Sequence, residues 1–244
     1  SDYSAWAWKA DDNEPTINEE GSIDSIVSAN ANAGFSIVKY TGTSASCQSV
    51  GHGLSSTPEL VMIKKTSGTE GWIVWYPGAS TTNWLELNST NASDTGANWG
   101  GTHSSTVVNL QNGPSGRSSA NGQDYIAYVW HSVSGYSKIG SYTGGGNTNP
   151  TINVGFAPDW LMVKKATGTA TGSTGWTMVD SARHPGTPTY DNGNVLYADD
   201  NLAEQDDDNE RGFIITSTGF SPNGNYFSTN NSGDTYIYMA FKMN

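Results

Sequence analysis

Acidic residues are the first candidates for chemistry, because glycan hydrolysis and calcium binding both depend on carboxylates. They gather in residues 11–20 and again in residues 199–210. A glycosidase needs two carboxyl groups at a defined separation on either side of the sugar bond. Both stretches are polar and lack strand-forming residues, so we interpret them as solvated loops. We therefore predict that the chain is not an enzyme.

The second acidic stretch is also the candidate metal site. Asp206, Asp208 and Glu210 could bind calcium, which takes about six to eight oxygen ligands. The stretch lacks the alternating Asp-x-Asp-x-Asp-Gly pattern of a calcium loop, so a hydrated acidic loop is the alternative. The four His and one Cys lack the spacing of zinc ligands, and we predict no other metal or cofactor.

Cys47 and His52 lie close enough in the sequence to form a Cys–His nucleophile. A lone Cys in a strand is more often an inert, small hydrophobic residue. A single Cys also excludes an intramolecular disulfide. This fits a protein that folds in a reducing cytoplasm and is released later, as virion proteins are. It fits equally well a secreted bacterial β protein that lacks disulfides.

Aromatic residues in polar loops are the candidates for ligand binding. Sugar rings present apolar C–H faces that stack on aromatic side chains, while Asn, Asp and His side chains can bond the hydroxyl groups. The candidate glycan-binding residues are Trp84, Trp99, His103, Tyr190, Asp191, Asn192 and Tyr197. The alternative is that the loop aromatics fold back and cover the end of a β-sandwich.

The composition indicates which elements must position these residues. Of the 244 residues 14% are charged, well below the roughly 25% of a typical globular protein. Aromatic residues make up 11%, including nine Trp, which argues against a disordered chain. Gly, Ser, Thr and Asn favour turns and the outward faces of strands. The composition therefore predicts an all-β protein and excludes a helical bundle, a coiled coil and a doubly wound nucleotide-binding fold.

The formal net charge of −12 restricts the partners. Phosphate binding requires clusters of Lys and Arg, so nucleic acid and anionic membrane surfaces are excluded. No apolar run approaches the roughly 18 residues of a membrane-spanning helix, so we predict no membrane insertion. The sequence has neither an initiator Met nor a signal peptide at Ser1, and we expect a fragment or a processed product of a longer protein.

Several motifs occur twice, about 100 residues apart, as expected for a duplicated domain. The matching pairs are residues 40–42 and 142–144, 58–65 and 158–165, 71–74 and 175–178, and 122–130 and 233–241. Tyr3–Lys9 resembles the last of these motifs, so we interpret it as the closing strand of a preceding repeat. The stretches between matching motifs, residues 77–105 and 181–211, differ and are predicted to be variable loops.

The repeated motifs carry the β-branched and aromatic residues of strands, bounded by Gly, Pro and Asn-Gly turns. We therefore predict two tandem antiparallel β-sandwich repeats, of jelly-roll or immunoglobulin-like type, at residues 34–133 and 134–244. Residues 1–33 are predicted to hold the extra N-terminal strand and a linker, and adjacent repeats could exchange strands. The aromatic residues predicted to lie in the core are Trp72, Trp75, Trp130, Trp160 and Trp176.

The sequence resembles a repeat module that is common in marine tailed phages, particularly those that infect cyanobacteria. The resemblance rests on residues 36–43 (SIVKYTGT), 50–65 (VGHGLSSTPELVMIKK) and 124–146 (DYIAYVWHSVSGYSKIGSYTGGG), and extends over nearly the whole chain. It implies a structural or adhesion role in a tail fibre or appendage and supplies no catalytic residues. The second repeat has Phe156 in the region where the first has His52, so a role for His52 would not be shared.

The leading hypothesis is therefore a non-enzymatic virion module, located on the virion or outside cells. It would bind other virion proteins, copies of itself or a host-surface glycan. One alternative is a carbohydrate-binding module of a secreted bacterial protein. Another is a subunit of an extracellular filament in which Tyr3–Lys9 is donated to the sheet edge of a neighbour.

Overall fold

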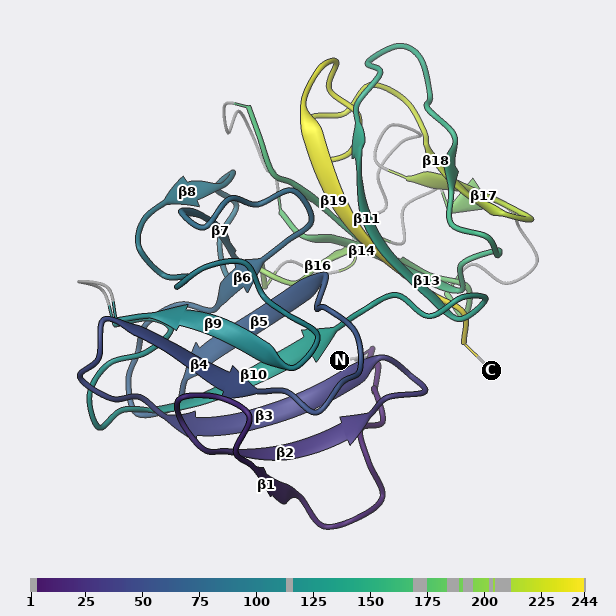
Figure 1. Cartoon of the computed structure of the whole chain (residues 1–244). Coiled ribbons are helices and arrows are strands. Elements are labelled where there is room, and N and C mark those ends of the chain that lie inside the picture. Colours follow the sequence, from purple (N-terminus) through teal and green to yellow (C-terminus); the bar gives the residue numbers. More distant parts are fainter. Residues whose placement is uncertain are drawn as a thin grey trace. The chain divides into compact units, whose positions relative to one another are not determined.

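The structure is a computed structural model. It describes residues 4–112, 116–168, 175–183, 189–190, 195–201, 204 and 212–243. In these ranges the regular elements are all strands, which confirms the predicted all-β class, and the strand ladders are antiparallel (Figure 1). The described residues contain no helix that could cross a lipid bilayer.

The chain divides into two compact units, of which unit 1 comprises Ser1–Glu70 and Ala97–His131. Its described strands are β1 (Thr16–Asn18), β2 (Ser25–Asn30), β3 (Phe35–Thr41), β4 (Cys47–Gly51), β5 (Leu60–Lys65), β9 (Val107–Gln111) and β10 (Asp124–Trp130). Strands β1, β2, β3, β10 and β5 pair in that order, and β4 pairs with β9. β1 and β2 lie in the stretch predicted to be a linker, so that prediction overlooked two strands.

Unit 2 comprises Gly71–Gly96 and Ser132–Asn244. Its described strands are β6 (Ile73–Trp75), β7 (Asn83–Glu86), β8 (Asp94–Thr95), β11 (Ser137–Thr143), β12 (Ile152–Asn153), β13 (Trp160–Lys165), β14 (Thr177–Asp180), β15 (Thr189–Tyr190), β16 (Leu196–Tyr197), β17 (Phe213–Thr216), β18 (Gly219–Pro222) and β19 (Thr235–Phe241). The pairing orders are β11-β19-β13-β14-β16, β12-β18-β17-β15 and β6-β7-β8. Unit 2 therefore includes strands from the first sequence repeat as well as the second. The repeat boundaries at residues 133 and 134 stay a prediction, since they concern sequence repetition and not packing.

The two units share one register around a central strand. In unit 1, β10 lies between β3 and β5, and Tyr125 is opposite both Tyr40 and Lys65. In unit 2, β19 lies between β11 and β13, and Tyr236 is opposite Tyr142 and Lys165. The repeated sequence motifs therefore occupy equivalent positions in the two sheets.

Each sheet has a core face that a second layer covers. In unit 1 the fully buried Val38, Tyr125 and Ala127 share this face. Ser36 Oγ, on the same side, donates a 2.6 Å hydrogen bond to the backbone carbonyl of His52, just past the end of β4. In unit 2 the corresponding core joins β13 and β19 to β17 and β18, with Phe213 and Phe220 fully buried. These contacts are compatible with a sandwich in each unit.

The predicted core tryptophans and turns are largely found. Trp75, Trp130, Trp160 and Trp176 are each at most 8% exposed, while Trp72 is half-buried. Two Asn-Gly pairs are described, one before β10 and one after β18. Their glycines, Gly122 and Gly224, have positive φ angles of 68° and 79°. Glycine adopts this left-handed backbone conformation without a Cβ penalty, which is why the pair predicts a tight turn.

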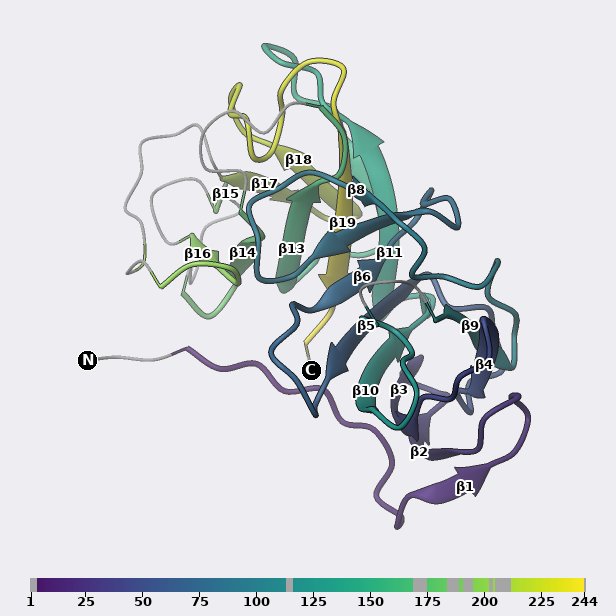
Figure 2. The same ribbon diagram turned by 90° about the vertical axis from the view of Figure 1, so that its left-hand side faces the viewer.

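Over its described residues, Ser4–Lys9, the strand predicted at Tyr3–Lys9 is not formed. The described residues from Ser4 to Pro15 lie outside any strand, and Figure 2 shows them as a length of chain that leads towards β1. The Trp8 ring packs edge-on against Trp130 of the same chain, with centroids 6.5 Å apart. The Asp11 N–H donates to Ser28 Oγ at 3.1 Å instead of joining a strand ladder. This packing removes the argument for donating the segment to a neighbouring subunit.

A stacked tyrosine pair recurs in both units. Tyr40 stacks on Tyr125 with centroids 5.2 Å apart, and its hydroxyl donates to the Ser118 carbonyl at 2.6 Å. Tyr142 stacks on Tyr236 at 5.1 Å and donates to a backbone carbonyl, that of Thr229. Burial raises the pKa of Tyr40 and of Tyr142 well above the ordinary value.

These tyrosines predict a loss of stability at alkaline pH. Near pH 10 the unfolded chain releases tyrosine protons that the folded chain retains, so their contribution is complete below about pH 10 and is lost as the pH rises above it. We expect the double variant Tyr40→Phe/Tyr142→Phe to lose less unfolding free energy than the wild type above that pH. Urea unfolding at a series of pH values measures the slope of the unfolding free energy against pH. An unchanged slope in the double variant would contradict the assignment.

Candidate functional site

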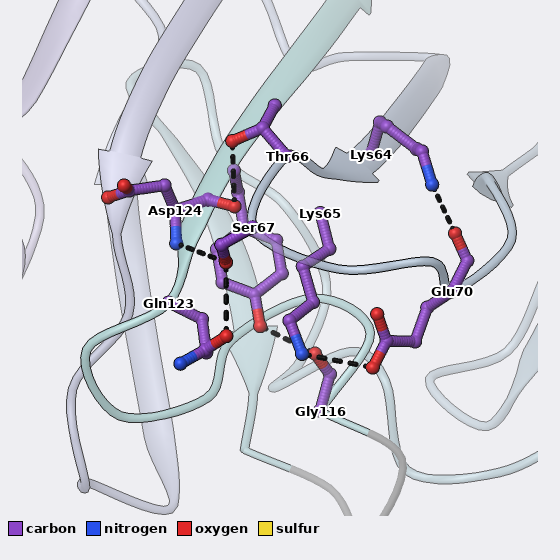
Figure 3. A network of polar contacts seen from close by, with 9 residues as sticks. Lys64, Lys65, Thr66, Ser67, Glu70, Gly116, Gln123 and Asp124 are labelled. Atoms are coloured by element: carbon purple, nitrogen blue, oxygen red, sulfur yellow. Dashed lines mark hydrogen bonds and ion pairs between the residues drawn. The ribbon is translucent and has the colours of Figure 1, made fainter.

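A polar network joins the end of β5 to the start of β10 (Figure 3). The Lys65 ammonium lies 2.9 Å from Glu70 Oε1, and Lys64 donates to the Glu70 backbone carbonyl. The hydrogen bond from Lys65 lowers the pKa of the Glu70 carboxyl. Two neighbouring lysines therefore hold one loop, and they do so through two different oxygens of the same residue.

The other half of the network ties the chain after β5 to the chain before β10. Ser67 Oγ donates to Gln123 Oε1 at 3.0 Å and accepts from the Asp124 N–H at 3.1 Å. The Thr66 N–H and hydroxyl both donate to the Asp124 carbonyl. These bonds fix the ends of the two strands.

Unit 2 has a more deeply buried version of this network. Lys165 Nζ lies 2.7 Å from Asp234 Oδ2, and the two side chains are 2% and 15% exposed. Asn231 Nδ2 donates to the same oxygen. Burial by itself would raise the pKa of Asp234, but the hydrogen bonds from Lys165 and Asn231 hold it below its ordinary value. The carboxylate is thus ionised and paired.

Lys164 has the most unusual environment of the four repeated lysines. It is fully buried, its Nζ donates to the Ser89 carbonyl at 3.1 Å, and it lies 6.0 Å from the centre of the Trp176 ring. Burial lowers the pKa of this amine to about 8, although the carboxylate of Asp199 opposes the shift. A lysine with a lowered pKa can act as a nucleophile when a substrate reaches it. Here the amine is enclosed and bonded, so we assign it a structural role.

Residues 86–93 of the first sequence repeat are bonded to strand β13 and to Trp176 of the second. Besides the bond from Lys164 to Ser89, Trp176 Nε1 donates to the Glu86 carbonyl at 2.8 Å, and the Ser93 N–H donates to the Ala166 carbonyl at 3.0 Å. We call residues 86–93 the docking segment. Its contacts explain why β6, β7 and β8 belong to the same compact unit as the second repeat.

The predicted glycan-binding residues that are described are buried. The exposed fractions are 6% for Trp84, 2% for Trp99, 5% for His103 and 8% for Tyr197. The structure brings Trp99 and His103 together edge-to-face, with centroids 5.5 Å apart, and places Trp84 in unit 2. A buried ring offers no open face to a sugar, so burial favours the alternative interpretation, that these aromatics cover the core.

The remaining predicted site residues stay predictions. Tyr190 lies in β15, but its side chain is not among those described. The candidates outside the described residues are Asp191 and Asn192 for glycan, and Asp206, Asp208 and Glu210 for calcium. Within the described ranges, no group of three or more His, Cys, Asp or Glu residues could hold a metal ion.

Two histidines are buried in unit 1. The His52 Nδ1 accepts from the Leu54 N–H at 3.1 Å, which places the ring proton on Nε2, 3.2 Å from the Ser104 carbonyl. Burial lowers the pKa of His52 and lowers that of His103 to about 3. Since both ring nitrogens of His52 meet backbone groups while Cys47 is exposed, the Cys–His nucleophile is not formed.

An open groove in unit 1 is the described cavity that sequence reasoning missed. Residues 9–12 and 29–32 line it, and its volume is about 320 Å³. Lys9 and Asp12 form an exposed ion pair at 2.7 Å, and Asn30 Nδ2 donates to the Lys9 carbonyl at 3.4 Å. The groove went unpredicted because this stretch was interpreted as a linker. Trp6, Trp8 and Ala10 alternate with polar or small residues, which indicates that one side of this segment is covered. This alternation is the sequence signal that could have revealed the groove.

The fold and these networks define an all-β protein in which one strand framework is present twice. The chain belongs to the family described as Domain of unknown function (DUF7483), whose profile matches residues 1–244. Neither a curated protein nor a solved structure matches the chain.

The two lysine–carboxylate pairs predict unequal effects of the same substitution. Lys165→Met leaves the Asp234 carboxylate without its cation in a nearly closed site, and we expect a loss of about 3–5 kcal/mol of unfolding free energy. Lys65→Met is the matched control. Its pair with Glu70 is more exposed, and we expect a loss of at most about 1 kcal/mol. Urea unfolding compares them, and equal losses would contradict the difference in burial.

Proposed function

We propose that the chain is a non-enzymatic structural module of a phage virion, part of a tail fibre or appendage. The observation that carries this proposal is the duplicated framework. Tyr125 and Tyr236 take the same place on a central strand, stack on equivalent partners and face equivalent lysines. Repeated units of this kind suit an extended assembly, because each added copy of the same structural unit lengthens it.

The use of the ionisable groups also supports a structural role. Lys65 and Lys165 each bind a carboxylate, while Lys64 and Lys164 each bind a backbone carbonyl. Buried His52 bonds the backbone through both ring nitrogens. These four lysines and His52 are thus engaged in holding strands and loops. Such internal pairs stabilise a fold that has a single Cys and hence no intramolecular disulfide.

The virion setting rests on the resemblance to tail-fibre repeats and on this architecture. The partners in that setting are other virion proteins, further copies of the chain and, for adhesion, a host-surface glycan. Immunogold electron microscopy tests the location, with antibody raised against residues 1–244 and applied to lysates of the source culture. We expect gold on the tails or appendages of particles. Gold on cell envelopes and on particle-free material alone would overturn the virion assignment.

A carbohydrate-binding module is the second candidate, and the groove between residues 9–12 and 29–32 favours it. Its volume is at the lower end of small-molecule sites, roughly 300–1,000 Å³, and ammonium, carboxylate and amide groups line it. Trp8, next to Lys9, is half-buried on Trp130. A sugar could therefore meet hydrogen-bonding groups here, unlike at the buried Trp84 and Trp99.

Filling the groove tests this second candidate. Ala31→Trp places a large ring in the lining, and we expect at least a tenfold loss of binding to any oligosaccharide that the wild type retains on a glycan array. Ala45→Trp, an exposed position away from the groove lining, should bind as the wild type does. A wild type that retains no glycan, or an Ala31→Trp variant that binds normally, would exclude the groove as a glycan site.

A further inference from the structure

The polar network of unit 2 holds an amine and a carboxamide on one carboxylate oxygen. Lys165 Nζ lies 2.7 Å from Asp234 Oδ2, and Asn231 Nδ2 donates to the same oxygen at 2.5 Å. Because both nitrogens are bonded to a single oxygen, the amine and the carboxamide are close neighbours. A carboxylate in this position can take a proton from one nitrogen and deliver it to the other, as a general base and then a general acid.

The three side chains lie in an enclosed site. The side chains of Lys165 and Asp234 are 2% and 15% exposed, and Asn231 is half-buried. The backbone at Gly168 approaches the Asp234 carboxylate so closely that a Cβ there would collide with it. Lys165 is directly opposite Tyr236, which is fully buried. An enclosed site keeps water away, and water is the competitor when an amine reacts with a carbonyl group.

The turn that carries Asn231 and Asp234 has an equivalent in unit 1. The Asp234 N–H donates to the Asn231 carbonyl at 3.3 Å, and in unit 1 the Gln123 N–H donates to the Ala120 carbonyl at 3.1 Å. The third residue of each turn is a glycine with a positive φ angle, 68° in unit 1 and 81° in unit 2. Gln123 therefore stands where Asp234 stands, and Ala120 stands where Asn231 stands.

Unit 1 forms this turn without the reactive groups. Ala120 has no carboxamide, and Gln123 has a neutral amide in place of a carboxylate. Lys65 occupies the same register position as Lys165, and Figure 3 shows that it binds Glu70 instead. The fold of the turn therefore does not require an Asn and an Asp at these two positions. Their presence beside the lysine of unit 2 points to chemistry that unit 1 does not have.

We propose that Lys165 and Asn231 join in an isopeptide bond, an amide between two side chains, with Asp234 as the catalytic residue. The lysine ammonium gives one proton to Asp234, and the neutral amine attacks Cγ of Asn231. The C–N bond to Lys165 forms and the bond from Cγ to Nδ2 breaks. Asp234 passes two protons in turn from the lysine nitrogen to the departing nitrogen, so that ammonium leaves and the carboxylate is restored.

The ion pair between Lys165 and Asp234 is the state before the bond forms. Attack requires Nζ within about 3–3.5 Å of Cγ, and the two bonds to Asp234 hold the amine and the amide side by side while the Asn231 side chain rotates into place. The product links the end of β13 to the turn before β19. A covalent link of this kind restricts the unfolded chain as a disulfide does, in a protein whose single Cys cannot form one within the chain. The proposal does not depend on the virion assignment.

Mass spectrometry of the full chain tests the proposal. After incubation at neutral pH we expect an intact mass about 17 Da below that of the sequence, which is the loss of one ammonia. Protease digestion should then give a branched peptide in which Lys165 is joined to Asn231. The branched peptide is decisive, because an Asn-Gly pair that cyclises to an imide loses the same mass. Mild alkali opens such an imide and leaves the isopeptide bond intact.

Three variants separate the chemistry from the packing, with circular dichroism as the check on folding. Asn231→Ala removes the carbonyl group under attack and keeps the ion pair, so it should fold and give no branched peptide. Asp234→Asn removes the proton acceptor and should also give none. Lys65→Met in unit 1 is the matched control and should give the same branched peptide as the wild type.

Three results would overturn the proposal. The first is a wild type without the branched peptide. The second is a loss of about 18 Da, one water, which would place the new bond on the Asp234 carboxyl instead of on Asn231. The third is an Asp234→Asn variant that forms the bond as the wild type does.

Discussion

The central strand of each sheet is the constraint on which the rest of the structure depends. A buried strand must have its backbone groups bonded on both sides, and β10 and β19 each meet this requirement with two antiparallel neighbours. Once the ladder is set, Tyr125 must face Tyr40 and Lys65, and Tyr236 must face Tyr142 and Lys165. A shift by one residue would turn these side chains to the wrong face. The stacked tyrosines and the lysine pairs thus follow from register.

The duplicated lysines show that the same sequence motif can place an amine in two different environments. Lys64 and Lys164 follow the same apolar run and both donate to a backbone carbonyl. Only Lys164 is fully buried, and its pKa is lowered to about 8 as a result. The cause is its burial against Trp176 and the docking segment, not its own motif. A shared motif therefore predicts the strand reliably and the reactivity poorly.

The features set by local pattern could be predicted from the sequence. The apolar runs at Leu60–Lys65 and Trp160–Lys165 form strands, and the tryptophans in repeated motifs are mostly buried. β2 was missed because its pattern is inverted: Ser25 is buried and Ile26 is exposed. The segment at Tyr3–Lys9 resembles a strand in composition, yet Trp8 packs on Trp130 and its described residues pair with no sheet edge. Composition predicts that a segment packs on a sheet. It does not predict whether the segment does so by pairing as a strand or through its side chains alone.

The candidate site was harder to predict, because it depends on contacts that are distant in the sequence. Trp84 and Trp99 lie in polar stretches, which suggested exposure, but distant packing buries both. The bond from Lys164 to Ser89 joins residues of different sequence repeats, and no local period signals it. Only the comparison of equivalent positions in the two units reveals that Lys164 is fully buried while Lys64 is half-buried.

The enclosed amine of Lys164 is a natural reporter of local opening. Acylating reagents attack an unprotonated amine that they can reach, and the Lys164 side chain has no exposed surface. A reagent can reach it only when residues 86–93 lift away. If opening and closing are fast, its acylation rate relative to an exposed lysine such as Lys39 gives the free energy of that opening. The acylation rate of this one side chain, followed by mass spectrometry, thereby measures how firmly the loop is attached.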